Sequence, residues 1–242
     1  MTSQIRIGML TPSSNTVLEP ISQAMIAGLP DVSVHFQRFP VTEIALSTDA
    51  LAQFDDAPIL RAAELLAHAN VDVITWNGTS SGWLGFEADE RLCARITAAT
   101  GAAATTSMLA LNEILAHNKA KRLALVTPYL PQVQARIVEN YDQLGFTCVA
   151  EKHLGLQDNF SFADISAATI SQMTKEVAAA SPDAIAIICT NMAGAPLVAD
   201  LEKALGIPIY DTVATAVWKS LCLAGVDPSR VQGWGSLFDL RL

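Results

Sequence analysis

One short pattern occurs twice in this chain, and this repeat restricts the fold more than any other feature. Residues 6–12 read RIGMLTP and residues 122–128 read RLALVTP. In both copies an Arg is followed by an apolar run and then by Thr-Pro at the same spacing. Because a strand buried on both faces needs a continuous apolar run, each copy predicts a strand inside a parallel sheet.

Two further pairs of segments follow the first pair in the same order. Residues 72–79 (DVITWNGT) match residues 183–190 (DAIAIICT), and residues 101–106 match residues 206–211 more loosely. Chance reuse of Gly, Thr and Pro at strand ends could produce one such pair, but three ordered pairs favour two halves of one ancestral fold. In the second pair the residue before the Thr differs: it is Gly78 in the first half and Cys189 in the second.

Strand-like and helical patterns alternate almost throughout the chain. Such alternation predicts parallel sheets covered on both faces by helices. We therefore expect two α/β sandwiches that meet at a cleft, the first formed by residues 1–115 with a contribution from 215–242, and the second by residues 116–214. The expected strands are residues 5–10, 32–39, 71–76, 122–126, 148–151 and 183–188, and the expected helices are residues 50–69, 87–100, 130–144, 163–180 and 196–205.

The composition narrows the class of protein. Of the 242 residues, 51% are hydrophobic, yet no apolar run is long enough for a transmembrane helix. The net charge of −9 and the lack of a Lys/Arg cluster argue against nucleic acid as a partner. The N-terminus has no signal-peptide pattern, and the four cysteines lack metal-ligand spacing. We expect a cytoplasmic protein with no membrane partner and no bound metal.

Polar residues gather where the repeated strands end. Open parallel sheets bind ligands beyond the carboxyl ends of their strands, so these residues are candidates for a binding site. Pro12, Ser13, Ser14 and Asn15 follow the first strand and precede a helix, whose unpaired N–H groups could hold an anion. An ordinary helix cap explains the same residues equally well. No nucleotide-binding Gly-rich spacing accompanies them.

The matched pair of strand ends offers a second set of candidates. Gly78 permits close approach of a ligand, and Thr79 and Ser80 could donate hydrogen bonds to an oxyanion, unless they only cap a turn. In the other half the strand ends at Cys189 and Thr190. A lone Cys is usually a buried apolar residue. Its position beside polar residues, in register with Gly78, nevertheless favours a functional thiol.

Two residues extend the candidate site. Tyr129 follows the fourth expected strand, and its phenol could donate to a substrate carboxylate, although a half-buried Tyr at a turn is an equal alternative. Asn159 lies in a loop long enough to cover a cleft. We expect this loop and residues 41–47 to set the shape of the pocket. The other three cysteines are expected in the core.

Together these segments resemble the aspartate/glutamate racemase superfamily, and within it the branch of maleate cis-trans isomerases and arylmalonate decarboxylases. The resemblance rests on residues 12–16 with Glu19, 78–80, 127–129, 158–159, 189–191 and 233–239, and it covers nearly the whole chain. It implies two Rossmann-like sandwich domains with parallel sheets related by a pseudo-twofold. It also implies an active-site cleft between them, no cofactor and a small dicarboxylate substrate. A homodimer is compatible with the resemblance.

The resemblance further implies which reactions fit. Racemases and maleate isomerases place a cysteine on each side of the substrate, whereas Gly78 replaces the first one here and only Cys189 is present. Gly-Thr-Ser followed by a single later Cys matches the decarboxylase pattern, while residues 12–16 and 158–159 are closer to the isomerases. We therefore expect a cofactor-independent lyase that decarboxylates a substituted malonate-type dicarboxylate, with Cys189 protonating an enediolate on one face.

Two alternatives remain at this point. The first is an isomerase of a small dicarboxylate, either a maleate cis-trans isomerase or an enzyme similar to amino-acid and hydantoin racemases, with Thr79 as the second group. A hydroxyl without a neighbouring base is a weak nucleophile, which counts against it. The second alternative is a carboxylate-binding protein that has lost catalysis, as the missing cysteine suggests.

Overall fold

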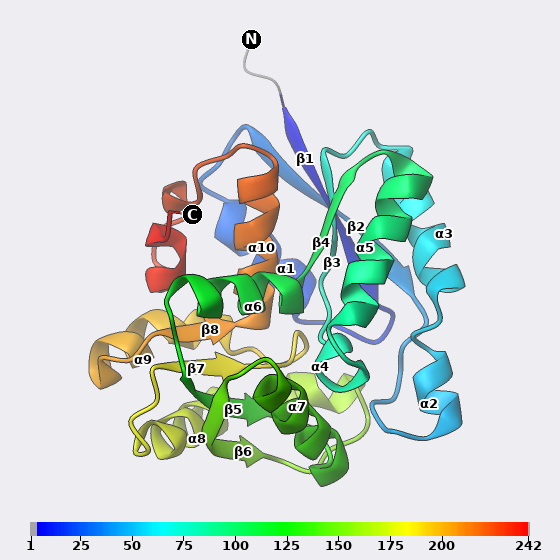
Figure 1. Cartoon of the computed structure of the whole chain (residues 1–242). Coiled ribbons are helices and arrows are strands. Elements are labelled where there is room, and N and C mark those ends of the chain that lie inside the picture. The colour runs from blue at the N-terminus through cyan, green and yellow to red at the C-terminus, as the bar shows by residue number, and fades with distance from the viewer. Residues whose placement is uncertain (1–3, 242) are drawn as a thin grey trace.

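The computed structural model describes residues 4–241, and within them the strands form two parallel sheets of four strands each. The first sheet has the order β2-β1-β3-β4 and the second the order β6-β5-β7-β8, so the strands of each half follow the same path (Figure 1). The bounds are β1 (Ile5–Pro12), β2 (Val32–Phe39), β3 (Val73–Trp76), β4 (Ala103–Thr106), β5 (Arg122–Thr127), β6 (Thr147–His153), β7 (Ala184–Ile187) and β8 (Ile209–Asp211). This agreement confirms the predicted pair of α/β sandwiches.

Helices cover both faces of the first sheet. On one face, α3 (Asp56–Ala67) and α5 (Glu87–Thr100) pack against each other and against the strands. On the other face lie α1 (Leu18–Ile26) and α10 (Thr212–Leu223), and α10 also contacts α6 (Ser107–His117). Hydrogen bonds from α10 reach the first half at Thr75, whose Oγ1 lies 2.6 Å from the Oγ of Ser220. The helix that follows β8 therefore joins the two halves.

The second sheet is covered in the same manner. Helix α8 (Ala167–Ala178) packs on β5, β6 and β7, and α9 (Val198–Leu205) packs on β8 and α8. Helix α7 (Pro131–Gln143) packs on β6 and contacts α4 (Ser81–Leu84) of the first half. The remaining elements are α2 (Thr48–Ala52), η1 (Phe160–Asp164), η2 (Ala195–Leu197), η3 (Pro228–Arg230) and η4 (Ser236–Asp239).

The repeated residues perform the same structural task in each half. The carboxylate of Asp72 accepts a hydrogen bond of 2.8 Å from the backbone N–H of Arg6, and Asp183 accepts one of 2.8 Å from that of Arg122. Each Asp therefore ties the start of its own strand to the neighbouring strand. Gly101 and Gly206 end α5 and α9 with φ values of 76° and 67°, a left-handed conformation that glycine adopts without a steric penalty.

The expected elements are found with two kinds of difference. The expected helix over residues 50–69 is wrong, because residues 53–55 separate α2 from α3. There the side chain of Gln53 accepts a hydrogen bond from the backbone N–H of Thr42 and donates one to the carbonyl of Glu43, which fastens the break to another segment. Strands β4 and β8 were not among the expected strands, since β4 contains only Ala and Thr and β8 has one aliphatic residue beside Tyr and Asp.

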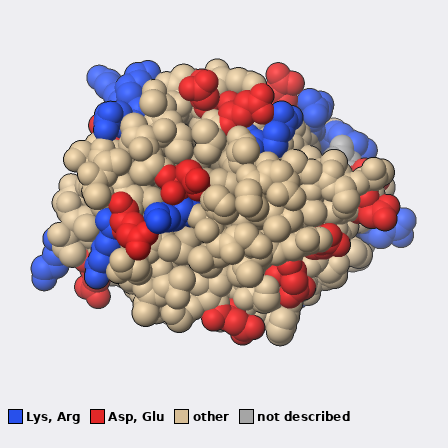
Figure 2. Space-filling model, turned by 90° about the horizontal axis from the view of Figure 1, so that it is seen from below, with Lys and Arg blue, Asp and Glu red and all other residues tan. Residues whose placement is uncertain are grey.

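Surface charge is mixed on the face that carries the second half. Figure 2 shows Lys and Arg scattered among Asp and Glu there, with large uncharged areas between them. Within residues 4–241, no helix is both long and apolar enough to cross a membrane. The domain limits given above and the exclusion of nucleic acid stay predictions.

Candidate active site

The carboxyl ends of β1, β3, β5 and β7 meet at one small cavity between the two sheets. Its volume is about 20 Å³, so side chains nearly fill it. A cavity needs roughly 10–15 Å³ to hold one water molecule, which puts this one near that limit. The residues that line it are Pro12, Val41, Ile44, Phe54, Trp76, Gly78, Thr79, Ser80, Trp83, Tyr129, Asn159, Cys189 and Thr190.

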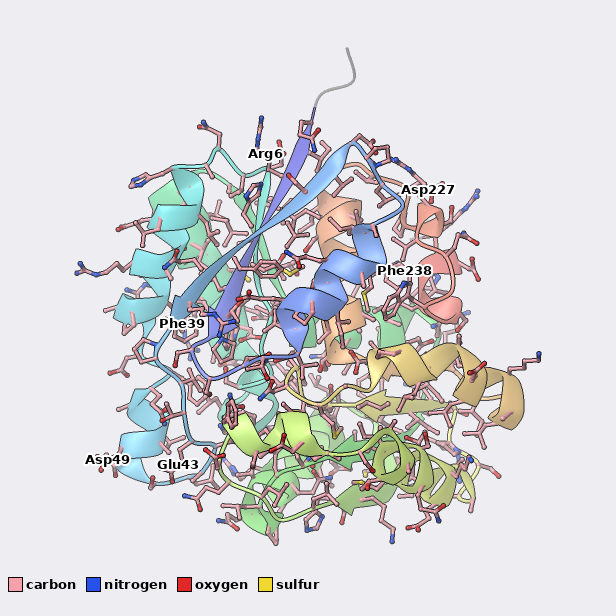
Figure 3. All side chains as sticks on the ribbon, turned by 180° about the vertical axis from the view of Figure 1, so that it is seen from behind. Arg6, Phe39, Glu43, Asp49, Asp227 and Phe238 are labelled. Atoms are coloured by element: carbon pink, nitrogen blue, oxygen red, sulfur yellow. The ribbon has the colours of Figure 1, made fainter. Side chains whose placement is uncertain are left out.

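The segment between β2 and α3 closes the cavity. Val41 and Ile44 line it, and backbone hydrogen bonds of 2.9 Å join Ile44 N–H to the carbonyl of Gln157 and Asn159 N–H to the carbonyl of Thr42. Figure 3 shows Glu43 on this segment, beside the second half, and an isolated antiparallel bridge pairs it with Asp158. The loop around Asn159 and residues 41–47 therefore do shape the pocket together.

The hydroxyls of Ser13 and Ser14 form hydrogen bonds with the backbone of this closing segment. Ser13 Oγ accepts a hydrogen bond of 3.1 Å from Val41 N–H, and Ser14 Oγ donates one of 2.6 Å to the Val41 carbonyl. Asn159 Nδ2 in turn donates to Ser14 Oγ at 2.8 Å. Neither serine lines the cavity. They hold Val41 in place, and the role of direct substrate contact remains a prediction for them.

An amide network joins the halves behind the cavity. The Oδ1 of Asn15 accepts hydrogen bonds of 2.9 Å from the N–H groups of Val17 and Leu18 and so caps α1, while its Nδ2 donates to Thr190 Oγ1 at 3.2 Å. Asn191 accepts from Thr16 N–H at 2.9 Å and donates to the carbonyl of Asn159 at 2.6 Å. Asn15 is therefore a cap and a bridge rather than a lining residue.

Two hydroxyls from different halves meet inside the cavity. Thr79 Oγ1 lies 2.7 Å from the hydroxyl of Tyr129, and both side chains are buried. Ser80 Oγ accepts a hydrogen bond of 3.3 Å from the indole Nε1 of Trp76. The ring of Trp83 packs edge-on against that of Tyr129, with centroids 5.3 Å apart. With the hydroxyl of Thr190, these are the four hydroxyls that a carboxylate in the cavity would meet.

Among the residues that line the cavity, Cys189 alone carries a thiol, and its side chain is only 2% exposed. Burial raises the pKa of the thiol to about 12. Hydrogen bonds from the N–H of Asn191, the Tyr129 hydroxyl and the N–H of Met192 lower the pKa, while the charge of Asp211 raises it. The thiol therefore keeps its proton at neutral pH.

A buried carboxyl lies behind this thiol. Asp211 caps α10 by accepting hydrogen bonds from Val213 N–H at 2.8 Å and Ala214 N–H at 3.4 Å. Burial raises its pKa to about 7, against these hydrogen bonds, which lower the pKa. Across residues 4–241, no group of three or more His, Cys, Asp or Glu is placed to hold a metal ion.

Most of the predicted site residues lie together. The structure brings Pro12, Gly78, Thr79, Ser80, Tyr129, Asn159, Cys189 and Thr190 to one cavity. Sequence reasoning missed Asn191 as a member of the network, although it is part of the quoted motif. It also missed the aromatic lining by Phe54, Trp76 and Trp83, because their apolar patterns do not differ from those of ordinary core residues. Of the other cysteines, Cys93, Cys148 and Cys222 are only partly buried.

Comparison with known proteins decides the family. The sequence profile of the arylmalonate decarboxylase family matches residues 7–238. The chain belongs to the arylmalonate decarboxylase family. This finding confirms the resemblance drawn from the sequence motifs.

Named relatives of this arylmalonate decarboxylase family member include both isomerases and a decarboxylase. Maleate isomerase of Nocardia farcinica is 28% identical over 239 residues, 96% of this chain and 94% of the relative. Arylmalonate decarboxylase of Bordetella bronchiseptica is 26% identical over 180 residues, 73% of this chain and 75% of the relative.

A solved structure extends this similarity to the fold. It is a cysteine-to-serine mutant of the Nocardia farcinica maleate cis-trans isomerase with a covalently bound succinylcysteine intermediate. It superposes with a TM-score of 0.88 at 25% identity, covering 97% of this chain and 98% of that one. The relatives are enzymes that differ in reaction class.

Proposed function

We propose that the protein is a cofactor-independent decarboxylase of a substituted malonate-type dicarboxylate. The observation that carries this proposal is the composition of the cavity, in which four hydroxyls and a single protonated thiol line one small space. Gly78 stands at the matching strand end and contributes no acid or base. One proton donor and a set of hydrogen-bond donors are what decarboxylation with one-sided protonation requires.

One substrate carboxylate is held by hydrogen bonds. Thr79, Ser80 and Tyr129 supply hydroxyls, and Thr190, the lining residue after Cys189, supplies a backbone N–H. By analogy with oxyanion holes, one such preorganised donor contributes about 2.7–4 kcal/mol to the transition state, because charge develops where the donor already points. The second carboxylate lies against the apolar wall, where loss of water raises its ground-state energy.

The reaction then proceeds in two steps. The bond between the central carbon and the second carboxyl group breaks, its electron pair passes into the remaining carboxylate to give an enediolate, and CO₂ leaves. The Sγ–H bond of Cys189 breaks next, its proton goes to the central carbon, and the thiolate regains a proton from solvent. Because the thiol approaches from the β7 side only, we expect a product of one handedness.

Isomerisation of a small dicarboxylate is the second candidate. It is favoured by the maleate isomerase relatives, which align over more of this chain than the decarboxylase relative does. In such a reaction Cys189 would need a partner, and Thr79 is the candidate. Within residues 4–241 the Thr79 hydroxyl meets another hydroxyl, that of Tyr129, and no basic group that would activate it.

The reaction class can be tested directly. Purified protein is incubated with malonates that carry methyl, amino or phenyl groups, and separately with maleate, and CO₂ and fumarate are measured. Evolution of CO₂ from at least one malonate supports the proposal. Fumarate without CO₂ supports the isomerase, and dicarboxylate binding without either product supports a non-catalytic binding protein.

A further inference from the structure

The indole of Trp76 occupies the space beside Gly78. A Cβ atom built on Gly78 would lie 2.1 Å from Cζ2 and 2.4 Å from Cε2 of Trp76. No real side chain fits at that distance, so position 78 must be glycine as long as the indole stays where it is. The lack of a side chain at Gly78 is therefore coupled to the large indole of Trp76, two residues earlier in the chain.

The indole is held firmly in this place. Its Nε1 donates a hydrogen bond of 3.3 Å to Ser80 Oγ, and its ring lies 4.9 Å from that of Phe39, centroid to centroid. Trp76 is 1% exposed and ranks among the largest fully buried side chains. A ring fixed by a hydrogen bond and by a packed neighbour does not yield like the end of a flexible chain.

We propose that Trp76 is the specificity-determining residue of this cavity, restricting the substrate to a small diacid whose substituent is of methyl or amino size and excluding aryl groups. This inference rests on the proposed function, since it names the substrate class of the same site. The indole forms the wall on the β3 side, where a ligand could otherwise approach the Gly78 backbone, and Cys189 contributes to the same cavity from the β7 side.

The size of the cavity supports this restriction. At about 20 Å³ the cavity is smaller than any of these diacids, so binding must displace part of its wall, and a phenyl group requires a larger displacement than a methyl group does. The other aromatic walls are braced by one another, since Phe54 packs on Trp83 at 5.7 Å and Trp83 on Tyr129 at 5.3 Å between ring centroids. Trp76 instead packs on Phe39, which does not line the cavity, so shortening Trp76 enlarges the cavity without disturbing the aromatic contacts around Tyr129.

The test compares the wild type with Trp76→Leu. The readout is the ratio of kcat/KM for phenylmalonate to that for methylmalonate, because the intrinsic difference in reactivity between the two diacids cancels when this ratio is compared between proteins. We expect the variant to raise the ratio at least about tenfold, the order of effect that a pocket of changed size exerts. Trp218→Leu is the matched control: this indole is also fully buried but lies outside the cavity, and its loss should leave the ratio unchanged.

A second readout does not depend on turnover. Dissociation constants of phenylmalonate and methylmalonate are measured by calorimetry for both proteins, with circular dichroism to establish folding. A relative gain for phenylmalonate in Trp76→Leu supports the inference even if no CO₂ is released, in which case only the proposed reaction fails. An unchanged ratio in a folded variant, or wild-type protein that binds phenylmalonate as tightly as methylmalonate, overturns the inference. If neither diacid binds either protein, both proposals fall. Should Trp76→Leu not fold, Trp76→Phe takes its place with the same expected direction.

Discussion

Thr79 and Tyr129 join the two halves of the molecule inside the cavity, with Thr79 Oγ1 and the Tyr129 hydroxyl 2.7 Å apart. Thr79 follows β3 of the first sheet and Tyr129 follows β5 of the second, and both side chains are buried. The Tyr129 hydroxyl also hydrogen-bonds the Cys189 sulfur, so a substrate oxygen that binds here would take a hydroxyl proton from one of these internal partners. A carboxylate at this position would therefore accept hydrogen bonds from both halves of the molecule.

Tyr129→Phe should lower kcat by about 10²–10³-fold, the range found when one oxyanion donor is removed. The ring contacts with Trp83 and Phe162 survive in the variant, so its melting temperature should change little. Steady-state kinetics on the malonate that the wild type turns over, together with a thermal melt, measure both effects.

Tyr141→Phe is the control for this variant. Its hydroxyl is buried, has no hydrogen-bond partner within residues 4–241 and lies outside the cavity, so its loss removes no donor that the proposed reaction uses. Activity should be unchanged and stability equal or slightly higher, because an unpaired buried hydroxyl is costly. Equal activities for the wild type and Tyr129→Phe would contradict the donor role.

Cys189→Ala should lower turnover by about 10²–10⁴-fold, the usual contribution of a positioned general acid. Because burial raises the pKa of this thiol to about 12, its ionisation should cause no loss of activity between about pH 6 and pH 9. Cys148→Ala, outside the cavity, should retain full activity. Turnover that survives the loss of the Cys189 sulfur, or an activity that falls with a midpoint near the free-thiol pKa of about 8.5, would contradict the role assigned to it.

The repeat made the architecture predictable because strand ends of a parallel sheet reuse the same residues for the same reasons. Asp72 and Asp183 start equivalent strands, and Gly78 and Cys189 end them, so aligning the copies already placed both ends at one cavity. β4 contains only Ala and Thr, and β8 has one aliphatic residue beside Tyr and Asp, so neither shows the apolar run that marked the similarly short β3 and β7. The place of β4 and β8 is set by pairing with β3 and β7, which only the folded chain provides.

The packing of aromatic rings could not be read from the sequence. Trp76 is the last residue of an apolar strand, a position that suits a core residue equally well. Its ring turns toward the Gly78 backbone, where a hydrogen bond to Ser80 and a ring contact with Phe39 hold it. Packing also decides which partners polar side chains find: the hydroxyls of Ser13 and Ser14 hydrogen-bond the backbone of Val41, and direct substrate contact by these serines stays a prediction.

Gly78→Cys alone should be destabilised, because the new Cβ meets the Trp76 ring at 2.1 Å and forces it out of its place. Overpacking of this kind costs about 1–3 kcal/mol. Trp76→Leu combined with Gly78→Cys removes the clash, so the double variant should be more stable than the sum of the two single changes. Urea unfolding of all four proteins in this double-mutant cycle measures the coupling between the positions.

The same double variant tests the one-sided chemistry. A thiol at position 78 would supply an acid and base on the β3 side, so the double variant should exchange the α-hydrogen of the decarboxylation product in D₂O, whereas the wild type should not. Trp76→Leu alone is the control, since it opens the cavity without adding a thiol. If the folded double variant binds the product but shows no exchange, the thiols at positions 78 and 189 do not reach the same carbon atom of the ligand.

Asp211→Asn should change how stability depends on pH. Burial raises the pKa of Asp211 from 3.8 in the unfolded chain to about 7 in the folded one, so its contribution to stability is fully present below about pH 4 and is lost as the pH rises through about 7. Asn carries no charge and caps helices as well as Asp does, so the variant keeps the hydrogen bonds to Val213 and Ala214. Relative to the wild type, the variant should gain stability between about pH 4 and pH 7, by an upper limit of about 4 kcal/mol.

The difference between the two proteins isolates Asp211 from the other buried carboxyl. Burial also raises the pKa of Asp89, to about 6, against hydrogen bonds from Thr106 and Ser81 that lower the pKa. Asp89 loses its contribution to stability over a similar pH range in the wild type and in Asp211→Asn. Its effect therefore cancels when the urea unfolding free energies of the two proteins are subtracted at each pH. If the two curves run parallel from about pH 4.5 to pH 8, Asp211 does not hold its proton in the folded state, and its charge already faces Cys189 at every pH in that range.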